Sequence, residues 1–191
     1  AVMILKKADE INIDAVKKLY DEAFPANERK PFEVIEKNRD RGITEILSIE
    51  NDKDNKNDKD NTDDIFRGLV ITIMKGDLVL VDYFAVDPNL RGQGTGATAL
   101  ELIRQRYASK RVFLEIELPG EQYDNNDQRI RRKAFYLRNG LKPSGIHTRV
   151  YETDMELLIF DKPISFEEYC GLFKMAMGER IKITGEPVLL D

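Results

Sequence analysis

Residues 78–107 read LVLVDYFAVDPNLRGQGTGATALELIRQRY, and this stretch predicts a strand, a glycine loop and a helix in succession. The strand, Leu78–Val86, is almost continuously apolar and rich in β-branched residues, which is typical of a strand buried on both faces. A turn leads into the loop Arg91–Gly96, which holds three glycines. The helix, about Ala97–Tyr107, carries apolar residues at spacings of three and four and therefore has one apolar face.

The glycine loop predicts an anion-binding site. Glycines tolerate positive φ and let backbone N–H groups approach a ligand closely. The helix behind them leaves its first N–H groups unpaired and carries a partial positive charge at that end. Arg91 adds a full positive charge at the mouth of the loop. We therefore expect an anion such as a pyrophosphate to bind here.

Two nucleotide-binding patterns fit the loop poorly. A Walker-type phosphate loop needs Lys-Ser/Thr after its last glycine, and Ala97-Thr98 stands there instead. A Rossmann fingerprint is matched literally, even to an acidic residue, Glu115, roughly 20 positions further on. However, Asp87–Arg91 separate the loop from its strand, and the chain supplies no further run of βαβ units. A Rossmann-type oxidoreductase is therefore the weaker alternative.

The remaining elements predict an α/β (α+β) fold. Further strands are expected over Val2–Leu5, Glu45–Ile49, Phe66–Met74, Arg111–Leu118, Lys142–Tyr151 and Glu156–Phe160, and helices over Asp14–Phe24, Phe32–Arg41 and Gln128–Asn139. Only the strand–helix–strand unit at 78–118 requires a parallel pair, and the other strands form hairpins. We therefore expect a mixed, mostly antiparallel sheet of six to seven strands with helices on both faces. Asn51–Asp64, nearly all Asn, Asp and Lys, predicts a mobile hairpin loop.

The glycine loop also resembles a known motif. Arg91-x-x-Gly94-x-Gly96, following Ala85-Val86-Asp87-Pro88, is similar to the acetyl-CoA loop of the GCN5-related N-acetyltransferase (GNAT) family, Gln/Arg-x-x-Gly-x-Gly/Ala. The resemblance covers about residues 1–160 and implies the GNAT fold. It implies that acetyl-CoA lies where the strands 78–86 and 111–118 splay apart, with its pantetheine paired to the end of the first strand. A tight turn with no ligand is the remaining alternative.

A second motif follows about 40 residues later. Residues 132–141, RKAFYLRNGL, resemble the family pattern Ala-x-x-x-Tyr-x-x-x-Gly-Phe, although the alanine is displaced and Leu141 replaces the phenylalanine. The family's tyrosine hydrogen-bonds the coenzyme A sulfur and protonates the leaving thiolate, which implies that role for Tyr136. The predicted apolar stripe of this helix is Ile130, Ala134, Leu137 and Leu141, with Tyr136 near its edge. A tyrosine that only packs at the core boundary is the alternative.

The residues implied to bind the cofactor come from both motifs. They are Phe84, Ala85, Val86, Arg91, Gly92, Gln93, Gly94, Thr95, Gly96, Ala97 and Tyr136. The second helix also carries a basic cluster, which is either a solvated face or a contact for the 3′-phosphate of coenzyme A. Its members are Arg129, Arg131, Arg132, Lys133 and Arg138.

Amine acetylation needs a base, because a lysine-like amine, with a pKa of about 10.4, is almost entirely protonated at pH 7. Reaching the neutral amine costs roughly 4–5 kcal/mol, which a general base offsets. Alternation places Glu115 and Glu117 on one face of the strand 111–118, and Asp82 stands alone among apolar residues of its own strand. These three carboxylates are the candidate bases, and salt bridges to the helix arginines are the alternative role. No suitable cysteine lies near either motif, so direct transfer in a ternary complex is expected.

Composition narrows the function classes. The 191 residues suit one domain, expected as an acetyltransferase domain over 1–160 with a C-terminal helix and tail, 161–191, packed on it. Ser165 and Glu168 predict a capping box for that helix, and the tail from Ile181 predicts an additional strand. One cysteine and one histidine make a zinc site improbable, so no metal is expected. The net charge of −5 disfavours nucleic acid, and the lack of a long apolar run disfavours a membrane span.

These observations together predict an acetyl-CoA-dependent N-acetyltransferase. The expected acceptor is a primary amine of a small molecule or peptide, and the expected setting is the cytoplasm, as a monomer or homodimer. A non-catalytic acyl-CoA-binding module of the same fold is the first alternative, and the Rossmann-type oxidoreductase is the second. Phe24-Pro25-x-x-Glu28-Arg29 also resembles a pattern of some bacterial family members, in which the segment between the first two helices overhangs the acceptor site. An ordinary connection between two helices is the alternative.

Overall fold

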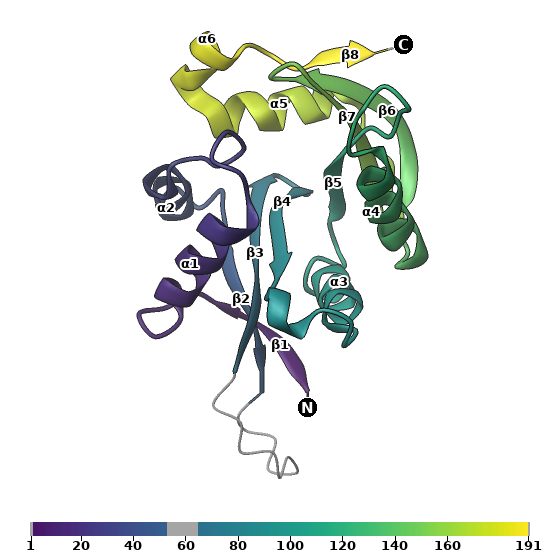
Figure 1. Ribbon diagram of the computed structural model, residues 1–191. Helices are drawn as coiled ribbons and strands as arrows, with labels where there is room; N and C mark the ends of the chain where they lie inside the picture. The colour runs from purple at the N-terminus through teal and green to yellow at the C-terminus, as the bar shows by residue number, and fades with distance from the viewer. Residues whose placement is uncertain (1, 53–64, 191) are drawn as a thin grey trace. The chain divides into compact units, whose positions relative to one another are not determined.

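The computed structural model describes residues 2–52 and 65–190, which form both helices and strands (Figure 1). Most of the segment in which composition predicts a mobile loop, 53–64, lies outside the described residues. The strands are β1 (Met3–Lys7), β2 (Ile46–Asn51), β3 (Phe66–Lys75), β4 (Leu78–Val86), β5 (Arg111–Glu117), β6 (Lys142–Val150), β7 (Thr153–Ile159) and β8 (Val188–Leu190). The helices are α1 (Ile13–Ala23), α2 (Phe32–Asp40), α3 (Thr95–Arg106), α4 (Asn126–Arg138), α5 (Phe166–Met177) and α6 (Ile181–Thr184), with short 3₁₀ helices η1 (Pro88–Leu90) and η2 (Gly178–Arg180).

The sheet is mixed and mostly antiparallel, as predicted. Its strand order is β1-β2-β3-β4-β5-β7-β6-β8. The β4–β5 pair is parallel, whereas the pairs β1–β2, β2–β3, β5–β7, β6–β7 and β6–β8 are antiparallel. The sheet has eight strands instead of the six to seven expected, because the tail also pairs with β6 through β8. This pattern does not fit a Rossmann domain, whose sheet is mostly parallel.

The parallel β4–β5 pairing is short. Its register runs from Leu78 opposite Arg111 to Val81 opposite Leu114. Strand β4 continues to Val86 and β5 continues to Glu117. The residues expected to bind the pantetheine and to supply a base therefore lie beyond the paired part of each strand.

The chain divides into two compact units, and each has its own core. The first unit comprises Ala1–Thr72 and Asp82–Arg106, and the second comprises Ile73–Val81 and Tyr107–Asp191. In the first unit, α1 and α2 pack on β2, β3 and β4 through the buried residues Val16, Leu19, Tyr20, Ile35, Ile46, Leu69, Ile71 and Tyr83. In the second unit, α5 packs on β4, β5 and β7 through residues that include Leu80, Phe113, Leu157, Tyr169 and Leu172.

Strand β5 organises the second unit by sending alternate side chains to opposite faces. Phe113 and Glu115 both contact Tyr169 of α5. On the other face, Ile116 is the register partner of Glu156, which forms an ion pair with Lys133 of α4. Helices therefore cover both faces of this part of the sheet, as predicted.

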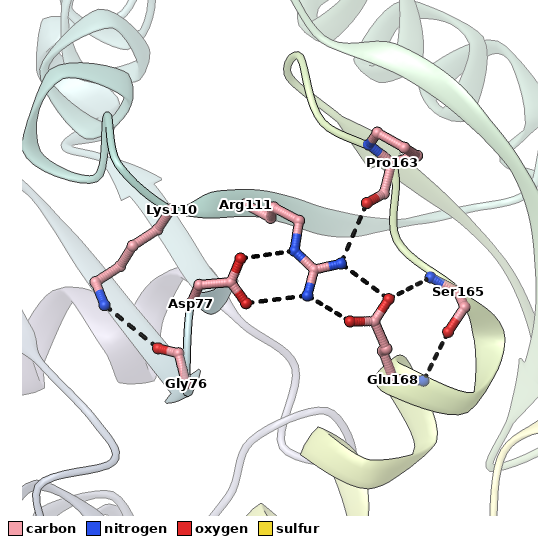
Figure 2. Close-up of polar contacts among 7 residues, drawn as sticks. All are labelled: Gly76, Asp77, Lys110, Arg111, Pro163, Ser165 and Glu168. Atoms are coloured by element: carbon pink, nitrogen blue, oxygen red, sulfur yellow. Dashed lines mark hydrogen bonds and ion pairs between the residues drawn. The ribbon is translucent and has the colours of Figure 1, made fainter.

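A single guanidinium fixes the start of α5 (Figure 2). Arg111 of β5 binds both carboxylate oxygens of Asp77, at 2.9 and 3.0 Å, and both oxygens of Glu168 on α5. It also donates to the Pro163 carbonyl at 3.3 Å. The predicted capping box is present, since the Glu168 amide donates to the Ser165 hydroxyl oxygen and the Ser165 amide donates to the Glu168 carboxylate, each at 3.1 Å. We call Arg111, Asp77 and Glu168 the arginine clamp.

The clamp sets the ionisation of its acidic members. Hydrogen bonds from Arg111 and from the Ser165 backbone lower the pKa of Glu168 from 4.5 to about 2. Hydrogen bonding to Arg111 also lowers the pKa of Asp77. The folded state is therefore stabilised by ionised Glu168 above about pH 4.5, and this stabilisation is lost as the pH falls toward about 2.

We predict that Glu168→Gln lowers the melting temperature of the protein at neutral pH, because it removes the carboxylate charge that Arg111 binds, whereas glutamine can keep the capping box. The deficit relative to wild type should shrink as the pH falls from 4.5 toward about 2, where wild-type Glu168 becomes protonated. Thermal denaturation followed by circular dichroism at a series of pH values measures this. Glu167→Gln, in the same helical turn and exposed, is the control and should change little. A deficit that is independent of pH would contradict the clamp.

Candidate functional site

The glycine loop joins β4 to α3 in the first unit. It follows η1, where the side chain of Asp87 accepts a hydrogen bond from the Asn89 amide at 2.9 Å. Gly92 has φ of 79° and Gly94 has φ of 76°, so both adopt the left-handed conformation that glycine was expected to supply. A Cβ added at either position would have no atom within 4 Å. The backbone conformation, rather than crowding, therefore requires glycine at both positions.

Helix α3 begins earlier than the sequence suggested. It starts at Thr95 instead of Ala97, so Thr95, Gly96 and Ala97 form its first turn. The Thr95 side chain is buried, whereas the loop residues Arg91–Gly94 before it are exposed. The first turn of a twelve-residue helix leaves N–H groups without intrahelical partners and carries a partial positive charge. An exposed loop at this end can therefore deliver an anion to backbone donors.

The end of β4 lies close against the backbone of β3. A Cβ added to Gly68 of β3 would lie 2.4 Å from the Ala85 carbonyl oxygen, so only glycine fits there. The Asp87 amide donates to the Arg67 carbonyl at 2.8 Å. Phe84, Ala85 and Val86 are half-buried. This backbone packing fixes the strand end that leads into the loop.

Asp82, one of the candidate bases, is held by a cation that sequence reasoning missed. The Lys30 ammonium lies 2.5 Å from the Asp82 carboxylate, and both side chains are largely buried. The same segment is tied to β4 by Tyr83, whose hydroxyl donates to the Glu28 carbonyl at 2.8 Å and accepts from the Lys30 amide at 3.2 Å. Burial raises the pKa of Tyr83 well above its ordinary value, so it remains a neutral donor. These contacts fasten the connection between α1 and α2 to β4.

The other two candidate bases lie on β5 in the second unit. Glu115 accepts a hydrogen bond from the Tyr169 hydroxyl at 2.8 Å. Glu117 lies at the end of the strand and forms an ion pair with Arg129 of α4 at 2.5 Å. The predicted salt bridge to a helix arginine is therefore present for Glu117. Sequence reasoning could not find Tyr169, because it lies 54 residues from Glu115 in a helix for which the sequence predicted only the capping box.

The predicted apolar stripe of α4 is wrong. Ile130, Ala134 and Leu137 are exposed, and the buried residue of this helix is Tyr136, with 4% of its surface accessible. Tyr136 is thus the centre of the inward face and not its edge. Leu141, beyond the helix, is buried as expected.

Long basic side chains take the place of apolar ones on the inward face of α4. Lys133 lies 2.8 Å from Glu156, a carboxylate of β7 that is only 2% exposed, and Arg129 is half-buried with its guanidinium 3.8 Å from the Tyr123 ring centre. The aliphatic stems of such residues pack like apolar side chains while their charges are neutralised by partners. Two of the five residues in the basic cluster therefore face the sheet. Arg131, Arg132 and Arg138 are exposed.

The structure groups the predicted residues by unit. The first unit holds Asp82, the β4 end Phe84–Val86 and the loop through Ala97, and the second holds Glu115, Glu117 and Tyr136. Within the described residues, no group of three or more His, Cys, Asp or Glu side chains could hold a metal ion. Every helix in that part of the chain is too short or too polar to cross a bilayer.

By sequence, no protein-family model and no curated protein matches this chain. Structure comparison finds several similar proteins. A protein of Bacteroides thetaiotaomicron assigned to the GNAT family of acetyltransferases has a TM-score of 0.64 and 19% identity, over 95% of this chain and 98% of its own. The ribosomal-protein-S18-alanine N-acetyltransferase of Escherichia coli has a TM-score of 0.53 and 14% identity, over 87% and 97% of the two chains.

A third similar structure contains the donor product. It is an aminoglycoside 6′-N-acetyltransferase complexed with coenzyme A, with a TM-score of 0.57 and 13% identity, over 84% of this chain and 99% of its own. All three similarities extend over most of both chains, although the sequences have diverged strongly. The chain therefore has the fold of the GNAT acetyltransferases.

Proposed function

We propose that this chain is an acetyl-CoA-dependent N-acetyltransferase of the GNAT family that acetylates a primary amine directly in a ternary complex. The observation that carries the proposal is the exposed loop at the N-terminus of α3, shaped by two left-handed glycines. It occurs in a fold shared with acetyltransferases, one of which was crystallised with coenzyme A.

The loop is suited to the diphosphate of the cofactor. Backbone N–H groups of Gly92–Ala97 and the positive end of α3 favour a doubly charged anion, and Arg91 adds an exposed cation at the loop entrance. The open space above Gly92 and Gly94 lets phosphate oxygens approach the backbone. The half-buried end of β4, Phe84–Val86, would pair with the amides of the pantetheine arm.

Tyr136 is the proposed acid. Its ring is anchored by burial in α4, and a tyrosine with a packed ring can still direct its hydroxyl at a ligand. Donation of that proton to the departing coenzyme A sulfur would prevent the thiolate from attacking the product. The Phe135 ring packs edge-on against Tyr136 at a centroid distance of 5.3 Å and limits its rotation.

Glu115 is the strongest of the three candidate bases. Asp82 and Glu117 are each engaged by a cation at 2.5 Å, so protonating either carboxylate would forfeit an ion pair. Glu115 accepts a hydrogen bond from the Tyr169 hydroxyl at 2.8 Å, and a buried phenol can hold the carboxylate in one orientation. Glu115 is therefore the candidate whose orientation the protein fixes through a hydroxyl group of another element.

The acceptor is proposed only as a class. The similar proteins include one that acts on an alanine of a ribosomal protein and one that acts on aminoglycosides, so the fold serves both peptide and small-molecule amines. The net charge of −5 favours a cationic acceptor over an anionic one.

We predict amine-dependent release of free thiol from acetyl-CoA. The wild-type protein is incubated with acetyl-CoA and a panel of aminoglycosides, polyamines, amino-acid amides and peptides with free N-termini, and released thiol is measured with a chromogenic reagent. Release that needs both protein and amine supports the proposal. Tight acetyl-CoA binding without release from any amine would instead support a non-catalytic acyl-CoA-binding module.

We predict that Gly94→Glu abolishes acetyl-CoA binding measured by calorimetry, because a carboxylate would stand where the diphosphate binds. The substitution also strains the backbone, by about 1–2 kcal/mol for a left-handed residue that is not glycine. Gly145→Glu is the matched control, since Gly145 lies in the β6 irregularity with φ of 80° and equally open space. It should lose similar stability and keep its affinity. Unchanged affinity in Gly94→Glu would refute the loop assignment.

We predict that Tyr136→Phe lowers kcat by about 10- to 100-fold, as expected for the loss of a general acid. The KM for acetyl-CoA should change much less, because the buried ring that supports α4 is retained. Steady-state kinetics with the best acceptor of the panel measure both constants. A variant with wild-type kcat would assign Tyr136 to packing alone.

A further inference from the structure

The segment after Phe160, which carries neither of the two family motifs, contributes a side chain that contacts the proposed base. Tyr169 is the fourth residue of α5, and its hydroxyl donates to Glu115 Oε2 at 2.8 Å. Its side chain has no accessible surface, so the phenol is held entirely by protein. A buried phenol needs a hydrogen-bond partner, and here that partner is the carboxylate that the proposed reaction requires.

Three neighbouring residues on one face of β5 hold α5 in this position. Arg111 clamps Glu168, the Phe113 ring meets the Tyr169 ring edge-on at 6.0 Å and 83°, and Glu115 accepts the hydroxyl. The strand that carries the base thus also carries the contacts that fix its hydrogen-bond donor. Figure 2 shows the arginine clamp on Glu168. Tyr169 is the next residue of the same helix, so the clamp also restrains its position.

The surroundings of Tyr169 leave its ring little freedom. Phe166 and Phe173 pack against it with centroid distances of 6.5 and 6.2 Å. A rigid donor restricts the carboxylate to one rotamer, whereas a half-buried glutamate without such a donor samples several. The base is thereby prepared before the substrates bind.

We infer that Tyr169 is a positioning residue for acetyl transfer: its hydroxyl orients Glu115, and residues 161–191 belong to the catalytic architecture through it. This inference rests on the proposed function. It assigns no new reaction, only the group that holds the base in place.

The proton balance defines what Glu115 must do. The amine nitrogen bonds to the thioester carbonyl carbon as the carbon–sulfur bond breaks, and the attacking ammonium loses two protons overall. Glu115 takes one and passes it to solvent, and the other replaces the proton that Tyr136 gives to the departing sulfur. Because Glu115 must meet the ammonium at a defined position, misorientation lowers kcat rather than cofactor affinity.

The test is a double-mutant cycle with Tyr169→Phe and Glu115→Gln. Tyr169→Phe keeps the buried ring and removes only the hydroxyl, so we expect kcat to fall about tenfold with the KM for acetyl-CoA changed less than about twofold. In the Glu115→Gln background, Tyr169→Phe should have no further effect, because the base on which it acts is gone. Tyr123→Phe is the matched control: its hydroxyl donates to Asp154 at 3.0 Å in the same unit, and its removal should leave kcat unchanged.

A purely structural tyrosine would behave differently. Wild-type kcat in Tyr169→Phe, or an equal loss of kcat with and without Glu115, would overturn the inference. Full activity in Glu115→Gln would also overturn it while leaving the acetyltransferase proposal intact. Absence of amine-dependent thiol release in the wild-type protein would overturn both.

Glu168→Gln gives a second route should Tyr169→Phe fold poorly. It loosens the clamp without touching the hydroxyl, so it should lower kcat in the wild-type background. The same substitution should leave the kcat of Glu115→Gln unchanged. Additive losses of kcat would contradict positioning through Glu115.

Discussion

Two left-handed glycines, Gly92 and Gly94, decide how the chain passes from β4 into α3. Any other residue at these positions would resist the turn, and the first turn of α3 would no longer follow an exposed, open loop. The neighbouring constraint is Gly68, which lets β3 approach the Ala85 carbonyl and so fixes the end of β4 before the loop. Backbone geometry, rather than any charged side chain, creates the proposed binding site for the diphosphate.

The second organising constraint is the alternation of β5. On one face of this strand, Arg111, Phe113 and Glu115 contact α5. The other face carries Ile116, the register partner of Glu156, which forms an ion pair with Lys133 of α4. Each helix is therefore fastened by a polar contact as well as by apolar packing: the arginine clamp for α5 and the Lys133–Glu156 pair for α4. Such pairs also penalise alternative registers, because a misplaced helix would leave Glu156 buried without its cation.

The sequence alone predicted the backbone well. The hydrophobic periods and turn residues placed most helices and strands within two residues of their observed bounds, and the Ser165–Glu168 capping box and the parallel β4–β5 pair were confirmed. These features depend on local propensity or on chain connectivity, which a single sequence records. The eighth strand was predicted within the tail from Ile181 but was left out of the expected count of six to seven, because three residues give a weak pattern.

Side-chain partners between distant segments could not be predicted in the same way. The stripe assigned to α4 failed because the helix buries lysine and arginine stems, and the carboxylate that permits this burial, Glu156, lies 23 residues from Lys133. The sequence around Asp82 does not indicate that its partner is Lys30, which is 52 residues earlier. The sequence around Glu115 likewise does not indicate that its partner is Tyr169. Periodicity indicates which residues are apolar but does not indicate which charges will neutralise each other across a sheet.

The most direct test of the central claim is a ¹⁵N nuclear magnetic resonance titration of the full chain with coenzyme A. If the glycine loop binds the diphosphate, the amide resonances of Gly92, Gly94, Thr95 and Gly96 shift together and saturate with one affinity. Resonances of this loop that stay unmoved while coenzyme A binds elsewhere, or fails to bind, would contradict the claim.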